Sequence, residues 1–451
     1  MNKNKLFYLQ SLGCSKNTVD SQSMAQILHN NGYQHTDQPE NAQVLIVNTC
    51  GFIGPAKEES MNALQELASN KNSDQILIAA GCLSQRYGSA ITKEISGIDG
   101  IIGTRRWMDI VDITDKMRKR KSNKTLYHLP DVPHVGKDEK GALRVAIQGS
   151  SAYLKIADGC RRPCAFCAIP LIKGSHISRP IDQIIEEAQH LQSIGTQEII
   201  LISQDTTDYG HDIGIKNGLA MLLKKLVRAV PEVPWIRIMY AYPGYVTNEL
   251  IETISTYPQI LPYLDMPLQH GNKSMLRRMK RPANLNWVYD TVNQMREKIP
   301  NLAIRTTFIV GYPGETEDEF QDLLNFVEDL QFDRLGAFQF SYESQTTSAP
   351  LGDPVSKKTK KDRFERLMHL QQNISLNNNQ RFIGKNLDVL IEGYDNGISI
   401  GRSYRDAPEI DGTVIIEGNL PIGQISNIQI TGAMTYDLSG IPSTTQNINL
   451  I

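Results

Sequence analysis

Three cysteines near the start of the chain each follow a short apolar run, and this repeated placement constrains the fold more than any other feature. The pairs are Leu6 to Leu9 before Cys14, Val44 to Val47 before Cys50, and Ile76 to Ala79 before Cys82. Short apolar runs bounded by turn residues are typical of strands buried on both faces. Helical patterns at 20–30 and 57–68 lie between them. The alternation predicts successive β–α units in a parallel sheet.

A parallel sheet would bring these three cysteines together, although 36 and then 32 residues separate them in the chain. The carboxyl ends of parallel strands lie on one edge, which is where ligands bind in such sheets. The alternative is three ordinary buried thiols, because free cysteine packs as a small hydrophobic residue. The threefold repetition favours a metal cluster on Cys14, Cys50 and Cys82.

The remaining three cysteines form a compact run, Cys160-Arg161-Arg162-Pro163-Cys164-Ala165-Phe166-Cys167. A structural zinc site normally has four ligands, often in paired C-x-x-C units, and the sequence offers no second unit nearby. Iron–sulfur cubanes are held by thiolates on short loops. Three thiolates would leave one iron open to a substrate or cofactor. The C-x-x-x-C-x-x-C spacing is typical of sites that bind S-adenosylmethionine (SAM) for radical chemistry.

The overall composition is that of a globular chain of about three domains. It has 451 residues, a formal charge of −2, 40% hydrophobic residues and six cysteines. Six cysteines are too few for a disulfide scaffold, so we expect a reducing compartment. The sequence shows neither a signal peptide nor ~18 consecutive apolar residues, and we therefore expect a cytoplasmic protein without membrane contact. The near-neutral charge excludes binding to nucleic acid through the overall field alone.

From residue 150 onward, six apolar runs alternate with helical patterns. They are 152–158, 198–203, 235–241, 263–268, 303–310 and 334–340. Six such units suggest an incomplete parallel β/α barrel with its site at the carboxyl-terminal face, by analogy with closed barrels. The segments that would share this face with the compact cysteine loop are Ser203-Gln204-Asp205, Gln269-His270 and Gly311-Tyr312-Pro313-Gly314-Glu315.

Two of these strand-end segments also have a structural explanation. Gly311 and Gly314 would let the backbone approach a ligand, but Thr316 and Glu319 form a capping-box pattern that glycine commonly precedes. A lone histidine such as His270 is often a hydrogen-bonded structural group.

The rest of the chain divides into a linker and a small β domain. Residues 121–145 contain two prolines and little apolar periodicity, which indicates a linker. Past Gly384, short β runs separated by glycines predict a small all-β barrel. The expected domains are 4–120, 146–379 and 380–447, joined by the linker.

On these motifs the whole of residues 4–447 resembles the methylthiotransferases of the radical-SAM superfamily. That family has an N-terminal methylthiotransferase domain, a radical-SAM barrel and a C-terminal TRAM barrel. The resemblance implies two 4Fe–4S clusters, an auxiliary one on Cys14, Cys50 and Cys82 and a SAM-cleaving one on Cys160, Cys164 and Cys167. Strand-end position further suggests SAM contacts at Phe166, Ser203, Gln204, Asp205, Gln269, Gly311, Gly314 and Glu315.

Four segments are similar to the bacterial branch of the family that modifies ribosomal protein S-twelve. They are Lys155 to Cys160, Met266 to His270, Arg278 to Pro282, and Gly401 to Gly412. That branch attaches a methylthio group to the β-carbon of an aspartate. The alternative is the sister branch, which modifies an adenosine of tRNA.

Charge at the C-terminal end points to the same branch. Residues 380–451 contain four basic and eight acidic residues, a net charge of −4. An RNA-binding barrel needs a basic face for phosphate contacts. A negative barrel suits a basic ribosomal protein.

The family mechanism implies that one SAM is cleaved to a radical that removes hydrogen from the target carbon, while a second SAM methylates the transferred sulfur. The implied partners are ribosomal protein S-twelve or the small ribosomal subunit, and an electron donor such as a flavodoxin or ferredoxin. We expect a monomer. A more distant alternative is a non-catalytic iron–sulfur module for electron transfer or RNA binding, which would not bind SAM.

Overall fold

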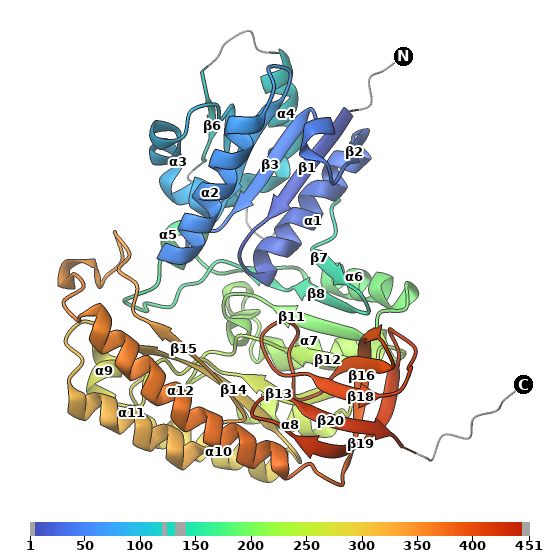
Figure 1. Cartoon of the computed structure of the whole chain (residues 1–451), viewed down its shortest axis with the longest axis vertical. Helices are drawn as coiled ribbons and strands as arrows, with labels where there is room; N and C mark the ends of the chain where they lie inside the picture. Colours follow the sequence, from blue (N-terminus) through green and yellow to red (C-terminus); the bar gives the residue numbers. More distant parts are fainter. Residues whose placement is uncertain (1–4, 120–123, 131–140, 444–451) are drawn as a thin grey trace, which may run out of the picture.

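The computed structural model describes residues 5–119, 124–130 and 141–443, which form three successive domains. Figure 1 shows an N-terminal α/β domain, a central curved sheet covered by helices on its outside, and a small red barrel against the side of that sheet. This arrangement confirms the predicted fold class.

The N-terminal domain is a six-stranded parallel sheet with helices on both faces. In spatial order its strands are β2 (Tyr33–His35), β1 (Lys5–Ser11), β3 (Val44–Thr49), β4 (Ile76–Gly81), β5 (Gly100–Gly103) and β6 (Leu126–His128). Helices α1 (Ser15–Asn30) and α4 (Ile110–Lys119) cover one face, and α2 (Gly54–Asn70) and α3 (Cys82–Glu94) cover the other. Val44 and Ile46 of β3 face the first pair, whereas Leu45 and Val47 face the second. Burial on both faces explains the continuous apolar runs of these strands.

The structure of this sheet corrects the prediction that residues 121–145 are only a linker. Within it, β6 pairs in parallel with β5, so that Leu126 lies opposite Gly100. Three residues are too short for a periodic pattern, which is why the sequence did not reveal the strand. Residues 121–123 and 131–140 of the linker lie outside the described residues.

The central domain is a curved seven-stranded sheet. Its spatial order is β15 (Arg334–Gln339), β14 (Ala303–Val310), β13 (Ile260–Asp265), β12 (Trp235–Ile238), β11 (Glu198–Ile202), β8 (Ser151–Lys155) and β7 (Val145–Gln148). Six strands are parallel, as predicted, and β7 adds an antiparallel edge beside β8. The helices are α5 (Ile169–Lys173), α6 (Ile181–Ser193), α7 (Gly218–Ala229), α8 (Asn248–Thr256), α9 (Lys273–Arg278), α10 (Leu285–Lys298), α11 (Glu317–Leu330) and α12 (Lys357–Gln380). A small pair, β9 (Ala157–Asp158) and β10 (Ile177–Ser178), frames the compact cysteine loop.

The C-terminal domain is a closed five-stranded barrel. Its strands are β16 (Asn386–Asp395), β17 (Ile398–Ser403), β18 (Val414–Glu417), β19 (Ile425–Ala433) and β20 (Leu438–Pro442). Its Leu390 and Ala407 join a buried apolar cluster with the inner face of the central sheet, including Tyr153, Ile200 and Tyr263. The C-terminal barrel therefore packs against part of the concave side of the incomplete β/α barrel. No helix in the described part of the chain is both long and apolar enough to span a bilayer.

Candidate active site

The first three cysteines meet at one edge of the N-terminal sheet. Strand β3 lies between β1 and β4. Thr49 of β3 is the register partner of Gly81 in β4, so Cys50 and Cys82 leave neighbouring strands at the same level. Cys14 lies just beyond the end of β1 and begins the turn into α1. The structure therefore brings these three thiols together, as the strand positions predicted.

Two polar side chains tie the loop of Cys14 to the loop of Cys50. The Asn17 side chain donates to the backbone oxygens of Leu12, at 2.7 Å, and of Asn48, at 3.2 Å. The Asn48 side chain in turn donates to the Asn17 carbonyl at 3.0 Å and to Ser21 Oγ at 2.8 Å. The sequence analysis did not single out either asparagine. Buried amides with several partners hold these loops in one geometry.

Glycine is required beside two of the three cysteines. Gly13 and Gly81 have φ of 93° and 97°, in the left-handed region that glycine favours. A Cβ on Gly13 would lie 2.9 Å from Cys50 Sγ, and one on Gly81 would lie 2.3 Å from Asn48 Oδ1. The repeated Gly-Cys dipeptide was the sequence signal for this close approach.

The first triad differs in exposure from one thiol to the next. Cys14 is exposed and Cys50 is buried. Burial raises the pKa of Cys50 to about 11 and that of Cys82 to about 12. These two thiols therefore stay protonated at neutral pH until a metal replaces the proton, which couples metal binding to proton release.

The second triad lies on the loop between β9 and α5. The Cys160 N–H donates to Gly174 O, and the Cys167 N–H donates to Cys164 O, both at 3.1 Å. Gly159 has φ of 73°, and a Cβ there would lie 2.1 Å from Ser175 O. Burial raises the pKa of Cys160 to about 11 and that of Cys167 to about 12. The loop is thus folded tightly around its three sulfur atoms.

Donor groups surround the sulfur atoms of the second triad. The Arg162 N–H donates to Cys160 Sγ at 3.4 Å, and Arg281 Nη1 donates to Cys164 Sγ at the same distance. The Tyr242 hydroxyl lies 3.8 Å from Cys164 Sγ. Hydrogen bonds to sulfur tune an iron–sulfur cluster. Arg281 and Tyr242 lie far from the cysteine motif in sequence, and the sequence analysis did not predict a role for either.

Neither triad is arranged as a site for a single metal ion. Among the described residues, no group of three or more His, Cys, Asp and Glu side chains is placed to hold one ion. A zinc ion requires every sulfur within about 2.3 Å of one centre. A cubane binds each thiolate at a different iron and therefore accepts thiols that lie further apart. The all-thiol chemistry of both sets fits a cluster.

Two of the predicted SAM contacts have polar atoms that the protein leaves without a partner. Within the described part of the chain, Gln204 Oε1 and Gln269 Oε1 are buried and accept no hydrogen bond. Gln204 follows β11 and Gln269 follows β13, where its φ is 77°. A buried acceptor without a partner is costly. A polar ligand at the carboxyl-terminal face of the central sheet, here called the mouth, would satisfy both. This observation fits SAM.

The next three predicted SAM contacts already interact with other residues of the protein. Asp205 accepts hydrogen bonds from Arg162 Nε and from Thr207 Oγ1, both at 2.6 Å, and Ser203 Oγ accepts from the Asp205 N–H at 3.1 Å. Phe166 packs beside an apolar cluster that includes Tyr312.

The glycines of the loop after β14 contribute in two different ways. A Cβ on Gly311 would lie 2.4 Å from Lys360 Cγ, so its close neighbour is a side chain of α12. A Cβ on Gly314 would lie in open space. The predicted capping box of Thr316 and Glu319 is confirmed at the start of α11.

The Glu315 side chain already has hydrogen-bond partners within the protein on both carboxylate oxygens. Its side chain is 0% exposed, and its Oε2 accepts from Gly311 N–H at 2.7 Å and from Arg363 Nη1 at 2.6 Å. Its Oε1 lies 3.0 Å from His270 Nε2. Both Glu315 and His270 therefore hold the strand-end loops in place.

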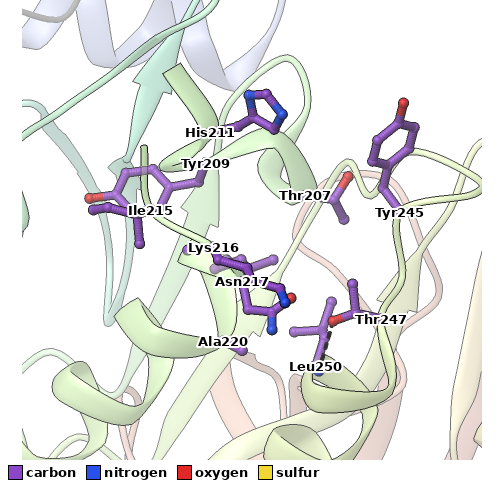
Figure 2. A pocket seen from close by; sticks show the side chains of 12 residues that line it. Thr207, Tyr209, His211, Ile215, Lys216, Asn217, Ala220, Tyr245, Thr247 and Leu250 are labelled. Carbon is purple, nitrogen blue, oxygen red and sulfur yellow. Dashed lines mark hydrogen bonds between the residues drawn. The ribbon is translucent and has the colours of Figure 1, made fainter. Parts of the chain in front are cut away.

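A separate cavity of about 220 Å³ lies beside this mouth, between the loop after β11 and helices α7 and α8 (Figure 2). Thr207, Tyr245 and Thr247 line one side of it, and His211 and Asn217 line other parts. Tyr245 also stacks under Arg162, whose guanidinium carbon lies 3.6 Å from the ring centroid. The second triad loop and the cavity therefore share a wall, although no predicted site residue lines the cavity.

The segment Gly401 to Gly412 is an interdomain contact. Arg402 Nη2 lies 2.7 Å from Glu198 Oε2 in β11, and Arg334 of β15 pairs with Asp406. The Tyr263 hydroxyl donates to Asp411 Oδ2 at 2.7 Å. The segment therefore fixes the C-terminal barrel against the central sheet.

Family models match all three domains. They are described as uncharacterized protein family UPF0004 over residues 6–103, the radical SAM superfamily over 154–327, and the TRAM domain over 383–442. Among solved structures, a radical S-adenosylmethionine methyltransferase, TsrM, from Kitasatospora setae superposes with a TM-score of 0.55. It is 14% identical and covers 77% of each chain, which shows a shared fold.

Curated relatives match nearly the whole length. A ribosomal protein uS12 methylthiotransferase RimO from Herpetosiphon aurantiacus is 44% identical, covering 96% of this chain and 99% of its own. The protein of the same name from Chloroflexus aurantiacus gives the same identity and coverage. That from a Thermoanaerobacter species is 42% identical over 95% of this chain. With both cysteine triads in place, this chain belongs to the ribosomal protein uS12 methylthiotransferase family of radical SAM enzymes.

Proposed function

We propose that this protein attaches a methylthio group to the β-carbon of an aspartate in ribosomal protein uS12. The observation that carries this function is the pairing of two cysteine triads, each at the carboxyl edge of a parallel sheet, in a chain that matches uS12 methylthiotransferases over 96% of its length. We propose domains at 4–120, 146–379 and 380–447, with β6 (Leu126–His128) as a further strand of the first domain's sheet.

The radical SAM superfamily uses SAM together with a 4Fe–4S cluster. We propose Cys160, Cys164 and Cys167 as the ligands of that cluster. Their loop supports this role because the Arg162 N–H and the Arg281 guanidinium already donate to sulfur atoms there. Gln204 and Gln269 would hold SAM by accepting hydrogen bonds that the protein does not supply.

We propose a second cluster on Cys14, Cys50 and Cys82. Three observations support it. The three strand ends converge, the side-chain amides of Asn17 and Asn48 each donate a hydrogen bond to the other residue's backbone oxygen, and Gly13 has no side chain that would exclude Cys50. The chain has no cysteine outside the two triads.

A hydrogen on an aliphatic carbon beside a carboxylate is not acidic enough for ordinary acid–base catalysis at neutral pH. Bound at these sites, the clusters and SAM supply the radical and the sulfur that such a carbon requires. The chain itself orients these groups: β11, β13 and β14 present their ends to the second triad, and Glu315 fixes two of the loops. The apolar filling of the barrel interior excludes water from the region below the mouth.

We also propose the remaining partners. Reduction of a cluster requires a one-electron donor, and a flavodoxin or ferredoxin provides one. The proposed substrate places the reaction in the cytoplasm, on free uS12 or on the small ribosomal subunit. We propose that the enzyme acts as a monomer.

Charge at the C-terminal barrel favours a protein substrate over tRNA. Two of its four basic residues, Arg402 and Arg405, are buried at the interdomain contact. The remaining basic side chains, Arg381 and Lys385, are outnumbered by the exposed acidic ones, which are Asp388, Glu392, Asp395, Glu409 and Glu417. A phosphate backbone would be repelled by this surface.

Paired mass spectrometry in a deletion strain tests the proposal. We expect uS12 to lose a mass corresponding to one methylthio group, while the tRNA adenosine keeps its modification. Complementation with the intact gene should restore the uS12 mass. Loss of the mark from tRNA with uS12 unchanged would assign the enzyme to the other branch.

A further inference from the structure

A cluster of five buried charges lies where the N-terminal domain meets the loop of the second triad. Each of its side chains is at most 2% exposed. Its members are Asp20 of α1, Arg144 before β7, Lys155 of β8, Asp158 of β9 and Lys173 at the end of α5. The cluster therefore joins elements of two domains.

Lys173 contacts both carboxylates of this cluster. Its Nζ lies 2.8 Å from Asp20 Oδ2 and 3.5 Å from Asp158 Oδ1. Arg144 Nη2 lies 2.7 Å from Asp20 Oδ1 and 2.9 Å from Asp158 Oδ2, and Lys155 also pairs with both carboxylates. Asp20 is thus held on three sides by cations, two of which come from the central sheet.

Lys173 also faces the first cysteine triad. It ends α5, the helix that follows the second triad, and α5 packs against α3, whose first residue is Cys82. Burial raises the pKa of the Cys82 thiol, and the nearby Lys173 ammonium opposes that effect. One side chain therefore connects the two carboxylates to a sulfur atom of the other domain.

The five buried groups carry an excess of positive charge. Three cations face two carboxylates, which leaves one positive charge unbalanced. Glu187, the next acidic side chain, pairs with Arg179 through two hydrogen bonds of 2.7 Å and also accepts one from the Arg144 backbone N–H at 2.9 Å. An uncompensated buried charge is unfavourable. Thiolate ligands around a metal are anionic and would supply the missing negative charge.

We propose that Lys173 is a positioning residue that supplies the positive charge balancing the anionic sulfur ligands of the first triad, while it anchors that triad to the central domain through Asp20 and Asp158. The inference rests on the second cluster proposed above. It couples the first cluster to the contact between the two domains.

Lys155 offers a matched control for this role. It is as buried as Lys173 and pairs with the same two carboxylates, but it lies on β8 and its charged neighbours are Asp20, Asp158, Lys173 and Arg144. Loss of either ammonium leaves the same carboxylates short of one partner. A purely structural role therefore predicts similar effects of Lys173→Met and Lys155→Met.

The experiment isolates the first cluster in the full-length chain. Cys160, Cys164 and Cys167 are replaced by Ala, and the midpoint potential of the remaining cluster is measured by redox titration monitored by electron paramagnetic resonance. We expect Lys173→Met to make the potential more negative, because loss of a nearby positive charge disfavours the added electron. We expect Lys155→Met to shift it less, and Lys173→Arg to keep it near that of the parent chain.

Two results would overturn the role of Lys173: an unchanged potential in Lys173→Met with iron retained, or an equal shift in Lys155→Met. If the Met variants do not fold, Lys173→Gln and Lys155→Gln are compared in the same way. A parent chain that binds no iron after loss of the second triad would instead overturn the second cluster, and this inference with it. Iron content thus separates the failure of the proposed function from the failure of Lys173.

Discussion

Thr49 of β3 and Gly81 of β4 are register partners, and each is followed directly by a cysteine of the first triad. The pairing places Cys50 and Cys82 side by side without any contribution from a loop. It works only because residue 81 is glycine, whose φ of 97° turns the chain into α3 while its α-carbon lies close to Thr49.

Gly81→Ala is therefore expected to remove the first cluster and spare the second. A Cβ at this position would lie 2.3 Å from Asn48 Oδ1 and 2.6 Å from Thr49 O, so Cys82 must move. Iron bound after anaerobic reconstitution should fall from about eight to about four atoms per chain. Gly32→Ala is the control, because Gly32 has a similar φ of 80° with nothing within 4 Å of its Cβ position. Equal iron loss in both variants would contradict the role assigned to Gly81.

Replacement of one cysteine in each triad should separate two partial reactions. Cys164→Ala is expected to abolish SAM cleavage because it removes a ligand from the site that would bind SAM. Cys50→Ala is expected to retain cleavage to 5′-deoxyadenosine but to yield no methylthiolated uS12. Chromatography of 5′-deoxyadenosine and mass spectrometry of uS12 measure the two outcomes. Methylthiolated uS12 from Cys50→Ala would show that the first triad is not the sulfur source.

Glu315→Gln should lower the free energy of unfolding by about 3 kcal/mol or more, because it leaves the Arg363 guanidinium without its buried carboxylate. Glu317→Gln changes the neighbouring acidic residue, whose side chain is 58% exposed, pairs with Arg366 and makes only a longer contact of 3.4 Å with Arg363 Nη2. That control should cost less than about 1 kcal/mol. Urea unfolding monitored by circular dichroism compares the two. Equal losses would mean that Glu315 does not organise the strand-end loops.

The ion pairs between the C-terminal barrel and the central sheet should make stability depend on acid pH. Burial alone would raise the pKa of Glu198, but Arg237 and Arg402 outweigh it and hold the pKa at about 2, below the ordinary 4.5. Because the folded pKa is lower, the charged form stabilises the fold fully above 4.5 and progressively less as the pH falls toward 2.

Glu198→Gln should therefore lower stability at neutral pH and flatten its dependence on acid pH. Urea unfolding at several pH values between about 5 and about 2 measures the slope. Glu417→Gln, at an exposed position on β18, should keep the slope of the parent chain. A slope unchanged by Glu198→Gln would show that this carboxylate gains no stabilisation from its two arginines.

The sequence was sufficient for the features that repeat or that depend on strand ends. Continuous apolar runs such as 44–47 and 76–79 revealed the buried strands, and their shared direction predicted where Cys50 and Cys82 would meet. Strand β6 could not be predicted, because it contains only 3 residues and its place in the sheet comes from pairing with β5.

The buried ion pairs could not be predicted from the sequence either. The sequence shows that Arg402 and Asp406 are charged, but only the fold shows that they face Glu198 and Arg334 of another domain. The similarity of segment 401–412 was therefore used to predict the substrate, whereas the contacts of this segment are with the central sheet. In the same way, Lys173 had no distinguishing pattern until α5 was packed against α3.

The burial of residues 401–412 has a consequence for how a large partner is engaged. A domain on a free tether can sample many orientations, but this barrel is fastened to the strands that end at the active-site mouth. A protein resting on its outer surface is accordingly held at one distance and one angle from that mouth. For a partner protein docked on that surface, the rigid barrel would set which length of substrate segment reaches the mouth, and a segment a few residues too short would bind without being modified.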